Sequence, residues 1–327
     1  MGKTRFIHSF VENKLVASYL LNRFAQSVIN IFFITILVFL LARATGDPAA
    51  ALVPDDLPEA AVIELRERLG LDKPLIHQYW LFIQDIASGD LGMSIKGHRP
   101  VIDMIIERIP ATFSLALSAL AVAMAMGIPL GVLSAVYRDT FIDRVAKVVA
   151  FLGQSTPPFW LAIMLILFFG VFLFEQGLPS LPVSGRGGPA TYIMPAFAMG
   201  WAVVAGVVRI TRSSMLDVLD SDYMTMARAK GLSETTVIWK HALRNALIPV
   251  VTYFGLIIAA FMNGSVVIEQ VFAWPGLGRL ALVAVTGRDF PVVQGVVIIV
   301  GIFLIVINLA VDILYAFIDP RIRYAKQ

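Results

Sequence analysis

The chain has 327 residues, of which 58% are hydrophobic and 15% are charged, and it contains no cysteine. A soluble domain carries about 25% charged residues, so this composition excludes an ordinary water-soluble fold and indicates a membrane protein. The absence of cysteine also excludes a disulfide framework and a thiolate metal site. The formal net charge is only +3, so the placement of the cationic residues is more informative than their sum.

Six apolar segments are long enough to cross a bilayer, because a helix of about 20 residues spans the hydrocarbon core. Continuous apolar runs such as 161–174 do not alternate as the strands of a membrane barrel would. Backbone groups in lipid must be paired within the chain, which leaves helices. We therefore expect an all-α membrane protein with six transmembrane helices at residues 24–42, 111–136, 146–174, 191–210, 248–271 and 293–316.

Prolines predict two departures from straight spans. The pair Pro157–Pro158 predicts a break in the third span, near one end of it. In the second span, Gly127 and Gly131 have the spacing of a close helix crossing. Pro129 lies between them and favours a kink, and of these two interpretations we prefer the kink.

Lys and Arg in the short loops predict the orientation, because they are enriched on the cytoplasmic side of membrane proteins. They gather before the first span, after the second, after the fourth and in the tail, at Lys3, Arg5, Lys14, Arg23, Arg138, Arg144, Lys147, Arg209, Arg212, Arg228, Lys230, Lys240, Arg244, Arg321, Arg323 and Lys326. The short loops on the other side carry Arg186, Arg279 and Arg288. We therefore expect a cytoplasmic N-terminal segment, 1–23, and a cytoplasmic tail, 317–327.

The sequence shows no catalytic constellation. It lacks a G-x-x-x-x-G-K-[ST] phosphate-binding loop, and its four histidines have no metal-binding spacing. The acidic residues Glu175, Glu269 and Asp312 fall near span ends, where we expect them to reach interfacial water. An ion-coupled carrier would place such groups at mid-depth. We therefore expect no catalytic residue, no metal site and no cofactor bound by this chain.

Residues 43–110, between the first two spans, predict a helical extracytoplasmic insertion. A first helix would run from a cap at Asp56 to Gly70, and a second from Pro74 to an end near Ser88–Gly89. The second is too short and too polar to cross the bilayer, so we interpret it as a re-entrant cap on the spans. Two further interpretations remain open: a docking surface for an extracytoplasmic partner, and membrane-interface anchoring by Tyr79 and Trp80.

The loop between the fourth and fifth spans, residues 211–247, differs sharply in composition from its flanks. It predicts a short helix, Asp222–Lys230, that Asp220 or Ser221 can cap and Gly231 can end. Ser233 can cap a second helix that leads into the fifth span. The first helix is too short to be stable alone, so it needs a partner, either in its own chain or in another protein.

The stretch from Ala227 to Ser233, followed by His241 to Pro249, resembles the EAA loop of permease subunits of ATP-binding-cassette (ABC) importers. Of the Glu-Ala-Ala triplet only Ala227 matches, and Pro249 comes five residues later than in the general motif. Both departures are typical of the dipeptide, oligopeptide and nickel branch. The resemblance to that branch covers residues 18–325. Other segments that resemble it are Gly46–Pro48, Leu69–Pro74, Gly89–Gly92, Arg108–Thr112, Arg288–Pro291 and Asp319–Arg323.

The resemblance implies a permease subunit in the bacterial or archaeal cytoplasmic (inner) membrane. It implies a second homologous permease subunit, one or two ATPase subunits that use ATP and Mg²⁺, an extracytoplasmic solute-binding protein, the lipid bilayer and no nucleic acid as partners. The first helix of the loop would be a cytoplasmic coupling helix that contacts an ATPase through Asp222, Tyr223, Met224, Ala227, Arg228, Lys230 and Gly231.

The cargo expected from the resemblance is a di- or oligopeptide, with glutathione, a nickel chelate or an oligosaccharide as alternatives. Candidate pathway-lining residues on the fifth span are Tyr253, Phe254, Met262 and Asn263. Two other classes of function are less consistent with the sequence. A self-sufficient secondary carrier would need inverted repeats and intramembrane charge, and an intramembrane enzyme would need a nucleophile and a base at matched depth.

Overall fold

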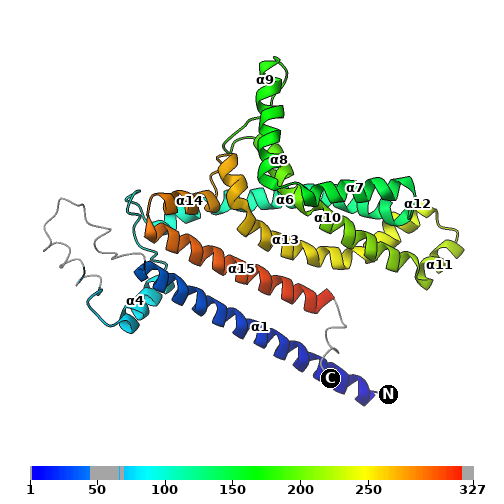
Figure 1. The fold of residues 1–327 in the computed structure, drawn as a ribbon. Helices are drawn as coiled ribbons and strands as arrows, with labels where there is room; N and C mark the ends of the chain where they lie inside the picture. Colours follow the sequence, from blue (N-terminus) through cyan, green and yellow to red (C-terminus); the bar gives the residue numbers. More distant parts are fainter. Residues whose placement is uncertain (1, 45–65, 67–69, 319–327) are drawn as a thin grey trace. The chain divides into compact units, whose positions relative to one another are not determined.

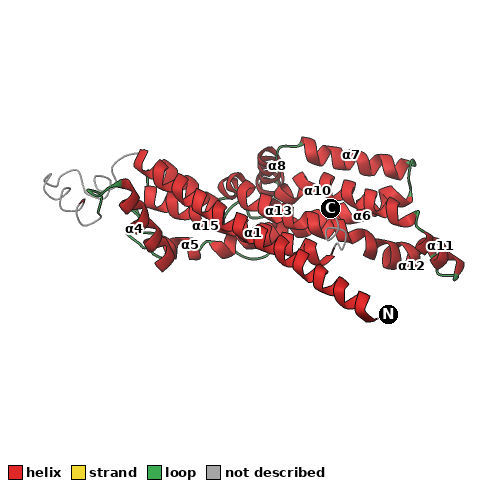
Figure 2. Ribbon diagram, turned by 90° about the horizontal axis from the view of Figure 1, so that it is seen from below, coloured by secondary structure: helices red, strands yellow, loops and turns green. Residues whose placement is uncertain are grey.

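The computed structural model describes residues 2–44, 66 and 70–318 (Figure 1). These residues form helices and loops, with one isolated bridge between Met93 and Pro100 (Figure 2). Six helical stretches are long and apolar enough to cross a membrane: Leu21–Leu41, Val101–Val136, Pro158–Glu175, Ala190–Leu219, Glu234–Met262 and Phe290–Val311. The predicted class, an all-α membrane protein with six spans, is confirmed.

The helices, in chain order, are α1 (Gly2–Ala44), α4 (Leu75–Ser88), α5 (Val101–Ile106), α6 (Ile109–Val136), α7 (Phe141–Ser155), α8 (Pro158–Leu165), η1 (Ile166–Phe172), α9 (Leu173–Glu175), α10 (Ala190–Leu219), α11 (Asp222–Ala229), α12 (Glu234–Thr236), η2 (Val237–Ala242), α13 (Leu243–Val271), α14 (Leu277–Thr286) and α15 (Phe290–Ile318). They fall into two compact units. One comprises Met1–Pro110 and Gly276–Leu309, and the other comprises Ala111–Pro275 and Ala310–Gln327.

In the first unit, the loop before α5 is bound to the turn between α14 and α15. The carboxylate of Asp289 accepts hydrogen bonds from the Ser94 hydroxyl and from the backbone N–H groups of Ile95 and Lys96, at 2.5, 3.1 and 3.2 Å. Asp289 is buried, so these three donors replace the water that a carboxylate would otherwise need. Apolar residues of α5, α14 and α15 form the core beneath, among them Val101, Ile105, Leu277, Leu280 and Val296.

Within the second unit, α6, α10 and α13 share the largest core, and α7 and α8 pack against α10. Where α6 meets α10, a methyl group on Gly127 would lie 2.6 Å from Val207 Cβ, and one on Gly131 would lie 2.6 Å from Thr211 Cβ. No real Cβ sits that close, so the two glycines let the helices approach. The close crossing, which was the less favoured interpretation of this segment, is therefore present, and α6 continues through Pro129.

The predicted third span, 146–174, is divided at the proline pair. Its first part belongs to α7, which ends before Pro157, and the apolar stretch that could cross a membrane is only Pro158–Glu175. Thr156 is extended, with φ −91° and ψ 116°, as steric clash with a following proline demands. In Figure 1, α8, η1 and α9 follow one another and turn away from α7 and α10.

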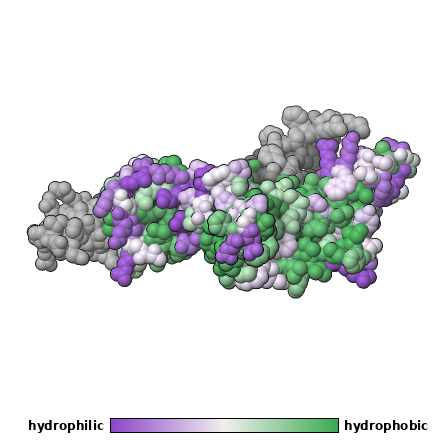
Figure 3. Space-filling model, turned by 90° about the horizontal axis from the view of Figure 1, so that it is seen from above, coloured by the Kyte–Doolittle hydropathy of each residue, from purple (hydrophilic) through white to green (hydrophobic). Residues whose placement is uncertain are grey.

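α7 is amphipathic. Its buried face, which includes Asp143, Ala146, Ala150 and Gly153, packs against α10 within the second unit. Its other face exposes a set of apolar side chains, Phe141, Ile142, Val145, Val148, Phe151 and Leu152. Figure 3 shows hydrophobic surface gathered where α7 lies.

The predicted second helix of the 43–110 segment is present as α4. It begins after Pro74 and ends at Gly89, whose φ of +83° is the left-handed conformation that favours glycine at a helix end. α4 packs against α1 within the first unit. Most of the predicted helix from Asp56 to Gly70 lies outside the described residues.

Candidate functional site

The polar loop between α10 and α13 carries the predicted short helix. α10 continues to Leu219, so residues 211–219 of the predicted loop are helical and extend the fourth span. α11 then runs from Asp222 to Ala229, and Gly231, with φ +78°, ends it as predicted. Ser233 caps α12 by accepting a hydrogen bond from the Thr236 N–H.

The side-chain cap predicted at the start of α11 does not form. Ser221 occupies the capping position with extended backbone, but its side chain accepts no bond from the helix. Its hydroxyl donates instead to the carbonyl oxygen of Val218, at 2.6 Å. The start of α11 is therefore tied back to the end of α10, and packing is what stabilises so short a helix.

One face of α11 is buried in its own chain. Met224 and Ala227 lie in a cluster with Met215 of α10 and Val237 of η2. Val132 and Ala135 of α6, Ala242 of η2 and Ala246 of α13 complete this cluster. Met224 is completely buried, so α11 is seated on the ends of three long helices and the turn η2.

The opposite face of α11 is exposed. Tyr223 and Met226, which are 48% and 59% exposed, lie one helical turn apart. Leu232 and Trp239, nearby in the sequence, are also exposed apolar residues. We call these four residues the exposed patch of the loop. Scattered exposed apolar residues are ordinary, but this set is carried by one short segment that is otherwise polar.

Polar contacts hold the exposed side chains in place. The Tyr223 hydroxyl and His241 Nδ1 are 2.8 Å apart, which joins α11 to η2. Arg228 forms an ion pair with Glu234 across the turn at Gly231, at 3.0 Å. Both members of this pair are exposed, so its contribution to stability is small. Asp222 and Lys230 are exposed as well.

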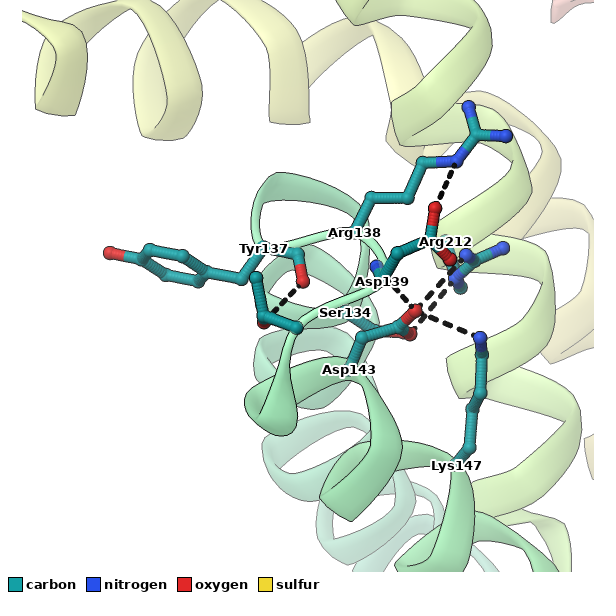
Figure 4. Close-up of polar contacts among 8 residues, drawn as sticks. Ser134, Tyr137, Arg138, Asp139, Asp143, Lys147 and Arg212 are labelled. Atoms are coloured by element: carbon teal, nitrogen blue, oxygen red, sulfur yellow. Dashed lines mark hydrogen bonds and ion pairs between the residues drawn. The ribbon is translucent and has the colours of Figure 1, made fainter.

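A buried carboxylate lies near the base of this loop (Figure 4). Asp143 of α7 accepts hydrogen bonds from the Ser134 hydroxyl and the Asp139 N–H, at 2.5 and 3.0 Å. Lys147 donates to it at 2.8 Å, and the guanidinium of Arg212, on α10, lies 3.4 Å away. These contacts join the α6–α7 turn to the part of α10 that leads into α11.

The balance of these effects keeps Asp143 ionised. Burial raises the pKa of a carboxyl group, but the hydrogen bonds from Lys147, Ser134, Asp139 and Arg212 outweigh it and hold the pKa of Asp143 well below its usual value. The charge is therefore permanent at physiological pH. Asp143 is completely buried, so it acts within the chain.

The predicted pathway residues of the fifth span do not share one environment. Phe254 and Met262 are buried, and Phe254 belongs to the largest core of the second unit. Tyr253 is half-buried beside Gly206 of α10. The side chain of Asn263 lies outside the described residues. A role in lining a pathway stays a prediction for all four.

Glu269 was placed wrongly by the sequence interpretation. It is completely buried, and its carboxylate accepts a hydrogen bond from the Thr112 hydroxyl at 2.8 Å. The turn after α13 is also bound to the start of α6, because the indole N–H of Trp274 donates to the carbonyl oxygen of Ala111 at 2.9 Å. The expected contact of Glu269 with interfacial water is therefore absent, and the group joins the end of α13 to the start of α6.

In the part of the chain that the structure describes, no group of three or more histidines and acidic residues could hold a metal ion.

The exposed patch contains three residues that the predicted contact set left out, Met226, Leu232 and Trp239. Helical spacing could have found the first, since Met226 lies one turn after Tyr223, whereas Met224 and Ala227 lie on the other face.

Comparison with known families gives two matches. The model described as "Binding-protein-dependent transport system inner membrane component" matches residues 127–324. The model described as "Binding-prot-dependent transport system membrane comp, N-term" matches residues 16–116. The two matches together account for most of the chain.

Individual relatives agree. The glutathione transport system permease protein GsiC of Escherichia coli (strain K12) is 44% identical over 309 residues, which cover 94% of this chain and 99% of GsiC. The protein of that name from Shigella dysenteriae serotype 1 (strain Sd197) matches equally. Among solved structures, an inward-facing MetNI methionine ABC transporter has a TM-score of 0.54 at 18% identity, over 66% of this chain and 96% of that one. That likeness shows the fold alone.

Proposed function

Because the chain belongs to the family of inner membrane components of binding-protein-dependent transport systems, it is a multi-pass permease subunit of an ABC importer, and we propose that α11 is its coupling helix. The proposal rests on one observation: α11 buries Met224 and Ala227 in its own chain while it exposes Tyr223 and Met226 on the other face. A helix that packs against its own chain on one face and is exposed on the other can contact a partner protein and transmit the partner's movement to the rest of the chain.

The seat of α11 supports a mechanical role. Met224 lies in one buried cluster with residues of α6, α10 and η2, and close-packed interiors transmit displacement because they deform little. The buried Asp143 contact with Arg212 ties α7 to the same stretch of α10. Movement of α11 would therefore reach several long helices together, which is how a small shift is converted into a larger rearrangement.

The partners follow from the family in general terms, namely ATPase subunits and a solute-binding protein. We propose further that ATP is hydrolysed only in the ATPase subunits, that a second, homologous permease subunit completes the pathway, and that both termini are cytoplasmic. The cationic loop between α10 and α13 supports this orientation, because such residues favour the cytoplasmic side. We propose that Tyr253, Phe254, Met262 and Asn263 line the pathway; Phe254 and Met262 are buried here and would have to be uncovered in another state of the cycle.

For the cargo we propose a small peptide or peptide-like solute. The 44% identity to permease proteins named for glutathione transport makes glutathione the first solute to test. A nickel chelate or an oligosaccharide is the alternative. Retention of radiolabelled glutathione by the cognate binding protein, with a dipeptide and nickel as competitors, would decide among them.

Cross-linking tests the role of α11, and the natural absence of cysteine simplifies it. Met226→Cys, in the assembled transporter with a single cysteine in the ATPase groove, should form a cross-link with a short bifunctional reagent. Ser88→Cys, which is also exposed but lies at the end of α4, serves as the control and should form none. Failure of Met226→Cys to cross-link at every position of the ATPase surface would contradict the proposal.

A further inference from the structure

α4 packs against the apolar part of α1, inside the stretch that could cross a membrane. The Tyr79 hydroxyl and the Thr35 hydroxyl are 2.9 Å apart. The Tyr79 ring meets the rings of Phe32 and Phe39 edge-on, with centroids 5.7 and 5.4 Å apart, and Phe82 lies beside Phe39. These contacts place the middle of α4 against residues 32–39 of α1.

The depth of this contact can be read along α1. The apolar stretch ends at Leu41, and Thr35 lies six residues before it, which is about 9 Å at the rise of an α-helix. Tyr79 therefore reaches well inside the end of the span. Arg43 follows the span and donates to the side-chain oxygen of Gln78 at 3.0 Å, which marks where the polar boundary lies relative to α4.

The buried side-chain amide of Gln78 forms hydrogen bonds with backbone carbonyl groups, which lipid could not do. Its nitrogen donates to the carbonyl oxygens of Leu71 and Lys73, at 2.9 and 2.8 Å. Gln78 is only 8% exposed. Irregular backbone at membrane depth is tolerated where its polar groups are paired, so this arrangement suits a loop that enters the boundary of the bilayer.

The exposed surface of α4 is divided into an apolar and a polar sector. Ile76 and Trp80 are 85% and 60% exposed and lie within about 40° of each other around the helix axis, at about 100° per residue. His77, Gln84 and Ser88 are also exposed, and they occupy the sector next to it on the side away from α1. An amphipathic helix in the plane of a membrane interface has this division.

We propose that the Ile76–Trp80 sector of α4 is embedded in lipid hydrocarbon, so that α4 is a re-entrant membrane anchor that fixes the segment after the first span to α1. The depth of the Tyr79 contact, about 9 Å inside the end of the apolar stretch of α1, favours lipid over an aqueous protein partner, because hydrocarbon surrounds a spanning helix at that depth. Trp80 suits this position, since its ring is apolar and its N–H is polar. This inference does not depend on the role proposed for α11.

Spin labelling of the assembled transporter in phosphatidylcholine and phosphatidylglycerol vesicles tests the proposal directly. Ile76→Cys and His77→Cys are neighbours in the sequence but point about 100° apart, so each is the matched control of the other. A nitroxide at residue 76 should collide severalfold more with oxygen, which partitions into lipid, than with a water-soluble nickel chelate. A nitroxide at residue 77 should show the reverse order.

Two outcomes would overturn the proposal. Equal access of the nickel chelate to residues 76 and 77 would place the whole helix in water, and protection of residue 76 from both reagents would place it under protein. A second measurement needs no label. Vesicles of brominated lipid should quench tryptophan fluorescence more in the unmodified protein than in Trp80→Phe, and an equal fractional loss in both proteins would count against lipid contact.

Discussion

The carboxylate of Asp143, on α7, is completely buried and lies 3.4 Å from the guanidinium of Arg212, on α10 (Figure 4). Arg212 lies two turns before the end of α10, and α11 begins three residues after that end. A buried charge with several donors is costly to leave uncompensated. The pair therefore fixes the α6–α7 turn to the helix that carries α11.

Asp143→Asn should lower the free energy of unfolding by about 1.5–3 kcal/mol, because Arg212 and Lys147 would lose their hydrogen bonds to a charged group. Asp139→Asn is the matched control, since Asp139 pairs with Arg138 on the surface, where both side chains are more than half exposed. An exposed pair contributes about 0–1 kcal/mol. Thermal unfolding of the purified complex distinguishes the two variants, and equal losses would show that burial of Asp143 is not what matters.

The same pair predicts a pH dependence. The pKa of Asp143 is held below its usual value, so its stabilising effect is complete above the unfolded-state pKa of about 3.9 and is lost as pH falls through the lower, folded-state pKa. The difference in unfolding free energy between the unmodified protein and Asp143→Asn should be constant between about pH 5 and 8. A difference that declines already between pH 8 and 6 would contradict this assignment.

Gly131→Ala should destabilise the crossing of α6 and α10. The new methyl group would lie 2.6 Å from Thr211 Cβ and 2.9 Å from the carbonyl oxygen of Val208, and overpacking of this kind costs about 1–3 kcal/mol. Gly188→Ala is the control, because nothing lies within 4 Å of the position of its methyl group. Thermal unfolding should show a loss in the first variant alone.

Gly231→Ala should weaken coupling through backbone strain. Gly231 has φ +78°, and nothing lies within 4 Å of an added methyl group, so any loss comes from the left-handed conformation, at about 1–2 kcal/mol. Gly231→Asn should restore much of the activity, since Asn tolerates this conformation better than Ala does. The measurement is ATP-driven uptake in vesicles. Equal activity of the Ala variant and the unmodified protein would show that the turn is not needed for transport.

Thr112→Val should destabilise the junction of α6 and α13. It removes the hydroxyl that donates to the buried carboxyl group of Glu269, and the loss of a hydrogen bond costs about 0.5–1.5 kcal/mol. Thr112→Ser keeps the hydroxyl and should be close to neutral. If both variants unfold at the same temperature, the contact does not contribute to stability.

The sequence predicted the spans because apolar runs of membrane length have few alternative structures. It also predicted the end of α11 at Gly231 and the division of the third span at Pro157–Pro158, since glycine and proline act through the local backbone. The close crossing at Gly127 and Gly131 was only the less favoured interpretation, because it depends on Val207 and Thr211, which are remote in the sequence.

Burial was harder to predict than helical structure. Met224 and Tyr223 are neighbours in the predicted contact set, yet one is buried and the other is exposed. The burial of Glu269 was not predicted from its position near the end of a span. It depends on Thr112, a residue distant in the sequence whose hydroxyl lies beside the carboxyl group of Glu269. Such contacts are set by tertiary packing, which a local pattern does not contain.

If α11 couples this permease to its ATPase, then a charge placed on the exposed face of α11 should stop uptake in reconstituted vesicles. Met226→Glu adds a charge to the exposed face without disturbing the buried face. With the partner permease, the ATPase, the binding protein and ATP present, the variant is expected to assemble in the membrane but to lose most of its glutathione or peptide uptake and its substrate-stimulated ATPase activity. Undiminished uptake and ATP hydrolysis by Met226→Glu would show that α11 does not couple the ATPase to transport.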